Sequence, residues 1–174
     1  MALGPVEYAV IAFPGNRFNG DVVPALIDLV AVSYTHLDVY KRQGEVTATD
    51  LEPNMVRFVN ERAQREGLQN LRAVLATEGG SGLARDSVDR ILMVHAWHHL
   101  PDRPALAKDL AAALRPGGRL FVVDFAVDAL RGPPASLRVA PEAIIAELAA
   151  AGLTAKVSTV AVPDQIVVEG WRWP

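Results

Sequence analysis

The chain has 174 residues, which is enough for one domain of ordinary size with a substantial buried core. Its 17 Lys and Arg against 20 Asp and Glu give a net charge of −3, and no long basic run suggests a nucleic-acid partner. The absence of cysteine excludes disulfides and thiol catalysis, and the short, interrupted apolar runs argue against a membrane span, so we expect a soluble, cytoplasmic protein.

The first 30 residues form a head whose pattern differs from the rest of the chain. Residues 7–13 (EYAVIAF) predict a strand, and residues 14–20 (PGNRFNG) predict a turn-rich loop. Residues 21–30 predict a helix with Asp21 as its N-cap. The head resembles the start of a family of short, uncharacterised bacterial proteins, a resemblance that implies no chemistry.

Residues 31–43 (AVSYTHLDVYKRQ) follow neither a helical nor a strand period. One choice of permitted codons gives this segment a DNA sequence whose two halves are reverse complements from the second base onward. The segment therefore resembles the translation of two transposon mosaic ends joined head to head. We interpret residues 31–43 as an artefactual junction and the chain as a chimera; an ordinary variable loop is the alternative.

Residues 44–174 alternate β-rich and helical runs, a pattern typical of a parallel sheet covered by helices. The last two strands are joined by Pro163 and Asp164, so they should form an antiparallel hairpin. There is room for one more helix between residues 76 and 88. The expected strands are 45–49, 70–76, 88–94, 119–124, 155–162 and 165–171, and the expected helices are 53–66, 104–114 and one that begins at Pro141 and ends at Gly152.

Three segments in this order, GEVTATDLEPNM, DSVDRILMVHAWHHLPD and LRPGGRLFVVDF, resemble class I S-adenosylmethionine-dependent methyltransferases. The resemblance covers residues 44–174. It implies a Rossmann-like three-layer α/β sandwich, whose mostly parallel sheet ends in an antiparallel β-hairpin. It also implies S-adenosylmethionine as cofactor and a small-molecule methyl acceptor as partner.

Asp50, Leu51 and Glu78 are the residues expected to bind the adenosine part of the donor. Asp50 ends a strand, so its carboxylate should lie at the carboxyl edge of the sheet, where ligands bind in such folds. By the resemblance, Asp50 accepts hydrogen bonds from the ribose hydroxyls, Leu51 packs against adenine and Glu78 receives the adenine amino group. The alternatives are a helix cap for Asp50, a core side chain for Leu51 and a solvated loop side chain for Glu78.

A second group follows the strand at residues 88–94 and should emerge at the same edge. We expect His98 and His99 to be catalytic, because a neutral imidazole can take a proton from the acceptor. The resemblance places His95 beside the donor, and Trp97 and Asp124 on the substrate side. At least one of the paired histidines should instead cap a helix or bind backbone, and Asp124 has the same alternative.

The HAWHH segment with Asp102 or Asp124 also raises the alternative of a metal site. Zinc and iron sites need three or four converging ligands, whereas neighbouring histidines point in different directions on most backbones. We therefore expect no metal. Pro116, Gly117 and Gly118 have a structural role in this interpretation, since they end a helix and permit a turn before the next strand.

The glycine-rich loop that precedes the ribose-binding acid in the resembling enzymes is missing, since no GxGxG occurs in the chain. The head supplies a strand, loop and helix that should fill the vacant position as a parallel strand. Its loop carries the bulky residues 16–19 between Gly15 and Gly20, so we expect donor binding and activity to be impaired or lost. The alternatives are a non-catalytic chimeric remnant without a ligand, and a metal-dependent hydrolase that uses the HAWHH segment.

Overall fold

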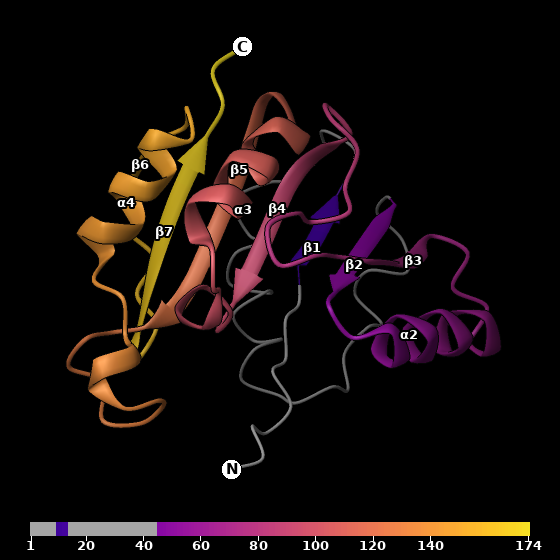
Figure 1. The fold of residues 1–174 in the computed structure, drawn as a ribbon, viewed down its shortest axis with the longest axis horizontal. Helices are drawn as coiled ribbons and strands as arrows, with labels where there is room; N and C mark the ends of the chain where they lie inside the picture. Colours follow the sequence, from indigo (N-terminus) through magenta and orange to yellow (C-terminus); the bar gives the residue numbers. More distant parts are fainter. Residues whose placement is uncertain (1–9, 14–44) are drawn as a thin grey trace.

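The computed structural model describes residues 10–13 and 45–174, which form a seven-stranded sheet in the order β3-β2-β1-β4-β5-β7-β6. Helices cover this sheet, as Figure 1 shows. The expected Rossmann-like α/β class is confirmed. The strands are β1 (Val10–Phe13), β2 (Val46–Asp50), β3 (Leu71–Leu75), β4 (Val88–Val94), β5 (Leu114–Phe125), β6 (Thr154–Val157) and β7 (Gln165–Trp171), and the helices are α2 (Pro53–Arg65), α3 (Arg103–Ala113) and α4 (Pro141–Ala150), with single 3₁₀ turns η2 (Trp97–His99) and η3 (Ala135–Leu137).

The main core lies where α3 and α4 pack on β4, β5 and β7. Alternating side chains of β4 supply Ile91 and Met93 to this core, and the helices supply Leu110 from α3 and Leu148 from α4, all at most 1% exposed. A smaller cluster around Leu92 and Val123 lies on the other face of the same strands. Burial on both faces explains why β4 and β5 read as near-continuous apolar runs.

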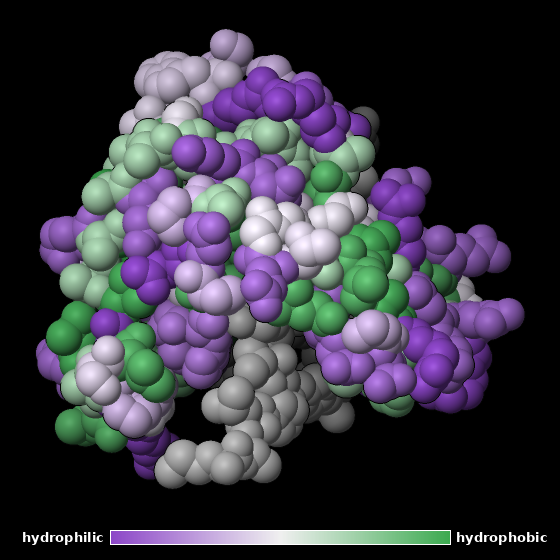
Figure 2. Space-filling model, in the orientation of Figure 1, coloured by the Kyte–Doolittle hydropathy of each residue, from purple (hydrophilic) through white to green (hydrophobic). Residues whose placement is uncertain are grey.

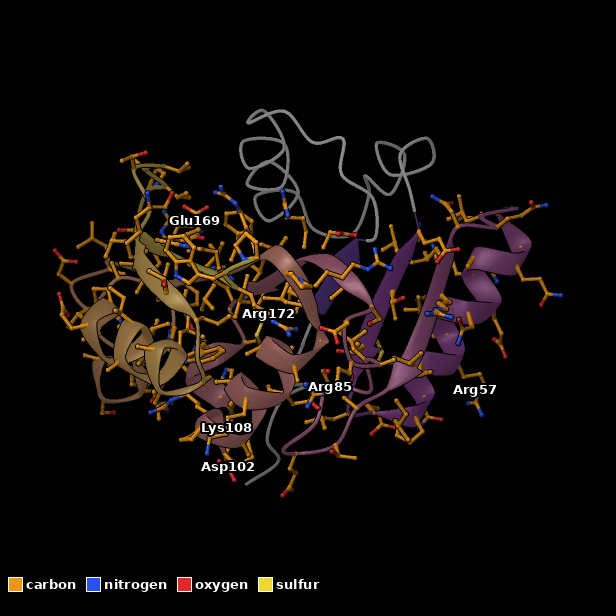
Figure 3. The ribbon with its side chains drawn as sticks, turned by 90° about the horizontal axis from the view of Figure 1, so that it is seen from above. Arg57, Arg85, Asp102, Lys108, Glu169 and Arg172 are labelled. Atoms are coloured by element: carbon orange, nitrogen blue, oxygen red, sulfur yellow. The ribbon has the colours of Figure 1, made fainter. Side chains whose placement is uncertain are left out.

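Each helix begins at a residue that its sequence favours. Asp102 caps α3 by accepting a hydrogen bond from the backbone N–H of Ala105 at 3.0 Å. Figure 3 labels Asp102 together with Lys108, which lies in the helix that Asp102 caps. Glu52 caps α2 through the N–H of Asn54, and Pro53 occupies the first helical turn. Gly67 ends α2 with a φ of 69°.

The opposite end of the sheet is built from β2, β3 and α2. β2 pairs with β3 in parallel, and the side chain of Asn60 in α2 hydrogen-bonds to the backbone of the outer strand, β3. The Asn60 amide donates to the carbonyl of Ala73 at 3.0 Å, and its oxygen accepts the N–H of the same residue at 2.8 Å. One side chain therefore satisfies both backbone groups of an edge-strand residue.

Most expected elements of residues 44–174 are confirmed, with shifted ends. β7 has the expected bounds, and β6 pairs with it as an antiparallel hairpin but is shorter than expected, since it ends at Val157. No helix lies between β3 and β4 in the described chain; turns occupy that connection. Residues 116–118 lie inside β5, where Gly117 has the expected positive φ of 79° and donates to the carbonyl of Arg172.

The direction of β1 corrects one expectation. β1 occupies the vacant position between β2 and β4, as expected, but it runs antiparallel to both. Val10 pairs with Thr49 and Met93 near the carboxyl ends of its neighbours, and Phe13 pairs with Arg90 near the amino end of β4. The chain therefore leaves β1 at the edge opposite Asp50. An apolar run fits a buried slot in either direction, which is why its sequence did not predict the polarity.

The other expectations about the head lie outside the described residues. These are the loop at residues 14–20, the helix at residues 21–30 with its cap Asp21, and the junction at residues 31–43. They remain predictions, and so does the division of the chain at Gly44.

Cysteine cross-linking tests the direction of β1 directly, because the chain contains no cysteine of its own. We expect Val10→Cys with Met93→Cys to form an intramolecular disulfide on mild oxidation, since these residues are paired across the two strands. The control pair is Phe13→Cys with Met93→Cys, which a parallel β1 would bring together instead. Mobility on non-reducing gels measures both, and cross-linking of the control pair alone would contradict the antiparallel assignment.

Candidate active site

The strands β2, β4 and β5 end at one edge of the sheet, which we call the carboxyl edge. β4 and β5 are parallel, and β2 shares their direction because β1 is antiparallel to both β2 and β4. In Figure 1 the arrowheads of β2 and β4 accordingly point to the same side, and that of β7 points to the other. β7 begins at this edge, since Gln165 pairs with Phe125. Asp50, His95, Asp124 and Gln165 are thus brought to one border of the molecule.

Asp50 lies at the end of β2, and backbone N–H groups of the following residues bind its carboxylate. Oδ1 accepts the backbone N–H of Glu52 at 2.8 Å, and the backbone N–H of Leu51 interacts with the same carboxylate. Burial raises the pKa of Asp50 and the charge of Glu52 adds to the rise, whereas the backbone N–H donors oppose it. Because Glu52 is the N-cap of α2, Asp50 does not have the capping role that was its alternative.

Leu51 and Glu78 are both near Asp50. Leu51 follows it directly and is half-buried, and Glu78 lies in the segment after β3. The backbone N–H of Ala76 donates to the carbonyl of Asp50 at 2.8 Å, which fixes this segment beside the end of β2. Glu78 is an exposed residue at the tip of a tight turn in which Thr77 and Gly80 exchange backbone hydrogen bonds.

The carboxylate of Asp124 is the best-anchored group of the site. It is 1% exposed, Oδ1 accepts from the Nδ1 of His98 at 2.7 Å and from the N–H of Phe125 at 2.8 Å, and Oδ2 accepts from the N–H of His98 at 3.0 Å. With the imidazole as donor, these bonds use Asp124 to position the segment after β4. This corrects the expectation that Asp124 contacts the substrate, because its oxygens already serve buried N–H groups.

His98 and His99 have different environments. The side chain of His98 is 2% exposed and bound to Asp124, whereas His99 is exposed and its ring lies 3.9 Å from the His98 ring between centroids. Burial and the neighbouring His98 lower the pKa of His99, and Asp124 opposes the change. Of the two expected catalytic histidines, only His99 is accessible, and a lowered pKa keeps it neutral at pH 7.

Trp97 corrects a further expectation. We expected it on the substrate side, but it is 0% exposed in the main core, and its indole N–H donates to Oε2 of Glu147 at 2.8 Å. Glu147 on α4 also binds Arg103 at 2.9 Å. The η2 turn directs Trp97 inward, so the apolar part of the ring is buried and its polar atom has a partner.

His95 has two unusual features. It has a φ of 51°, a left-handed conformation that a non-glycine residue seldom adopts, and its Nε2 is buried without a hydrogen bond to another described residue. The His95 ring stacks on Phe125 of β5, with centroids 4.2 Å apart. Burial lowers the pKa of His95, with a smaller contribution from His98, while Asp124 and the side chain of Gln165 oppose the change.

Gln165 is a site residue that the sequence did not reveal. Its Oε1 is also buried without a hydrogen bond to another described residue, and its side chain interacts with the ring of His95. The only sequence signal is a polar residue at the first position of an otherwise mostly apolar strand. Such a residue is common at strand ends, so the sequence did not single it out.

The alternative metal site is not supported by the part of the chain that the structure describes. No group of three or more His, Cys, Asp or Glu side chains there is arranged to hold a metal ion. His98 and Asp124 hydrogen-bond to each other and His95 stacks on a phenyl ring.

Among the residues that the structure describes, no helix is both long and apolar enough to cross a bilayer.

A comparison with protein families decides the class of the chain. Residues 30–122 match the family described as "Methyltransferase domain", which is more than half of the chain. The chain belongs to this family. The metal-dependent hydrolase is therefore not favoured, and S-adenosylmethionine is the cofactor that the family implies.

Relatives and solved structures agree with the family. The chain is 33% identical over 88 residues to "Methyltransferase GfsG" of Streptomyces halstedii, covering 50% of this chain and 32% of the relative. It is 30% identical over 79 residues to a "Ubiquinone biosynthesis O-methyltransferase" of Xanthomonas axonopodis pv. citri (strain 306), covering 45% of this chain and 33% of that one. The chain thus spans about a third of the length of these two relatives.

The fold resembles that of an S-adenosylmethionine-dependent methyltransferase from Aquifex aeolicus with a TM-score of 0.63 at 22% identity, over 87% of this chain and 75% of the other. A type 11 methyltransferase from Sulfolobus solfataricus gives a TM-score of 0.60 at 15% identity, over 89% of this chain and 80% of that one. These likenesses show the methyltransferase fold.

Removal of the Asp124 carboxylate should destabilise this methyltransferase domain strongly. In Asp124→Ala the Nδ1 of His98 and two backbone N–H groups lose their acceptor in the core, and we expect the free energy of unfolding to fall by about 3 kcal/mol. Asp128→Ala, at an exposed residue of the next loop, is the control and should change it by less than about 0.5 kcal/mol. Urea denaturation measures both, and equal stabilities would contradict the anchoring role.

His95 should make stability depend on pH. Its pKa is lowered from 6.5 by folding, so as pH falls the unfolded chain takes up the proton first and the folded state loses stability. We expect the loss between about pH 7.5 and about pH 5.5 to be smaller in His95→Gln than in the wild type. His99→Gln, at a more exposed ring, should reduce it less. Urea denaturation at both pH values measures this, and an unchanged loss in His95→Gln would contradict it.

Proposed function

We propose that the chain is an S-adenosylmethionine-dependent methyltransferase domain that acts on a small-molecule acceptor and whose donor binding is weakened by the reversed β1. The observation that carries this proposal is the position of the Asp50 carboxylate at the carboxyl edge, where β2 ends. Ligands of open α/β sheets bind at this edge. The family match supports the reaction, and the site residues support its division into a donor and an acceptor side.

The donor side is formed by Asp50, Leu51 and Glu78. Asp50 accepts hydrogen bonds from the ribose hydroxyls, Leu51 packs on the adenine ring and Glu78 accepts from the adenine amino group. Backbone hydrogen bonds hold Asp50 and the segment that carries Glu78 side by side, so the group is organised before the ligand arrives. When bound, the cofactor supplies an electrophilic methyl group.

The acceptor side is formed around His99. His99 is neutral at pH 7 and takes the proton that the acceptor releases on a ring nitrogen. The ring of His98 packs against the ring of His99, and Nδ1 of His98 is bound to the buried carboxylate of Asp124. Asp124 and His98 are therefore positioning residues, and His99 is the accessible base.

The antiparallel β1 is the reason to expect impaired activity. The loop after the first strand recognises the amino-acid part of the donor in the resembling enzymes, and here the chain leaves β1 at the opposite edge. Among the described residues, those at the carboxyl edge fit the adenosine part of the cofactor, and no strand between β2 and β4 ends at that edge to present a loop to its amino-acid tail. The alternative is a non-catalytic chimeric remnant without a ligand, and ligand binding separates the two.

Calorimetry with two ligands that differ only in the amino-acid tail tests this assignment. We expect S-adenosylhomocysteine and 5′-methylthioadenosine to bind with dissociation constants within about threefold of each other, because only adenosine is recognised. Asp50→Ala should weaken both by about tenfold or more, through loss of a charged acceptor. Glu61→Ala, at an exposed residue of α2, is the control and should leave both unchanged.

Two outcomes contradict the proposal in different ways. Binding of S-adenosylhomocysteine far more tightly than 5′-methylthioadenosine would show that the tail is recognised despite β1. Failure of both ligands to bind would support the non-catalytic remnant.

A further inference from the structure

The segment between β3 and β4 contains a glycine-rich turn, of which the proposed function uses only Glu78. Residues 76–83 read ATEGGSGL, with glycine at positions 79, 80 and 82. Glycine loses more conformational entropy on folding than any other residue, so such a turn keeps one shape only if other parts of the chain hold it. The carboxylate of Glu78 can meet a ligand at a fixed place only under that condition.

The turn is closed on itself and returns onto β3. Thr77 and Gly80 each donate a backbone hydrogen bond to the carbonyl of the other, and Glu78 lies between them. Gly82 has a φ of 74°, and a Cβ at this residue would lie 2.5 Å from the carbonyl oxygen of Leu75. Only glycine fits this position, so the chain after the turn can lie directly against the end of β3.

Helix α3 supplies a second support through Asp109. Its Oδ2 accepts the backbone N–H of Ser81 at 2.7 Å and the hydroxyl of Ser81 at 2.5 Å. Ser81 is 1% exposed, and its hydroxyl oxygen accepts the N–H of Leu83 at 3.2 Å. Both donors of a buried residue thus share one carboxylate oxygen, and truncation of Asp109 would deprive them of it.

The turn also packs on the same face of α3. A Cβ at Gly79 would lie 3.4 Å from the Cβ of Ala105, which precedes Asp109 by one helical turn, and a Cβ at Gly80 would lie 4.0 Å from Oδ1 of Asp109. Figures 1 and 3 show the connection between β3 and β4 on the side of the sheet that α3 covers. Near the centre of Figure 2, where this connection passes, the surface is near-white, as glycine, serine and threonine are on this scale.

The other end of the turn is tied to the ribose-binding residue of the proposed donor side. The N–H of Ala76 donates to the carbonyl of Asp50, so the turn is held by β2 at one end and by α3 at the other. Glu78 is exposed between these two supports. Its place relative to Asp50 therefore depends on Asp109 as well as on β3.

We infer that Asp109 is a positioning residue that gives the donor side its preference for adenine. Through Ser81 it holds the turn so that the carboxylate of Glu78 meets the amino group of the base. Hypoxanthine has a carbonyl oxygen in place of that amino group, so it would present one acceptor to another. The inference rests on the proposed function, since it requires Glu78 to face the base.

Calorimetry with 5′-methylthioadenosine and 5′-methylthioinosine, which differ only in the base, measures this preference. We expect the wild type to bind the adenine compound about tenfold more tightly, because a hydrogen bond to a charged group replaces a contact between two acceptors. Asp109→Ala should lower the ratio to about threefold or less by weakening the adenine compound alone. Asp109→Asn should keep the ratio, because a single oxygen accepts both donors of Ser81.

Further variants separate positioning from a general loss of structure. Glu78→Ala should lower the ratio as Asp109→Ala does, whereas Asp50→Ala should weaken both compounds equally and keep it. Ser81→Ala removes only the hydroxyl bonds, so it should lower the ratio even if Asp109→Ala does not fold. Lys108→Ala, at an exposed residue of α3 that Figure 3 labels, is the control and should change neither affinity.

The outcomes distinguish the inference from the proposed function. A full ratio in Asp109→Ala, or an equal loss of affinity for both compounds, would overturn the positioning role and leave the donor side in place. Equal binding of the two compounds by the wild type would overturn the preference itself. If the wild type binds neither compound, the donor side is rejected, and the inference with it.

Discussion

The carboxyl edge depends on one buried carboxylate. Asp124 accepts hydrogen bonds from His98 twice and from Phe125 once, and so ties the end of β5 to the turn that follows β4. A buried charge without partners would be costly, and these donors are what keeps it in place. The same bonds orient His98, set the path of the backbone into η2 and leave His99 as the exposed histidine of the pair. Chemistry at this edge therefore relies on a residue that itself has no access to solvent.

The direction of β1 is the second constraint, and it acts through topology. The slot between β2 and β4 is filled, so the sheet is continuous and the core beside it is intact. Reversal of one strand nevertheless moves the exit of the chain from the carboxyl edge to the other edge. Sheet stability and ligand recognition are thus separated: hydrogen bonding needs only a strand in the slot, whereas binding of a donor tail needs that strand to end on the correct side.

The sequence predicted most of the fold after Gly44 because apolar period, proline and glycine act locally. β7, the start of α2 at Pro53 and the positive φ of Gly117 follow from such signals. The site was harder to predict. The position of Asp50 follows from its place at a strand end, but the burial of Trp97 depends on Glu147 of α4, which is far away in the sequence. The pairing of His95 with Gln165 likewise joins β4 to β7, and no local pattern encodes it.

Asn60 has a consequence beyond the packing of α2. The outer strand of an open sheet presents unpaired backbone groups that can recruit another chain, and β3 is such a strand. At Ala73 the Asn60 amide engages both of these groups and imitates the neighbour that the strand lacks. An incoming chain would have to displace this amide before it could add to the sheet. The helix therefore hinders the addition of a further strand, and with it fibril-like aggregation, at the β3 edge.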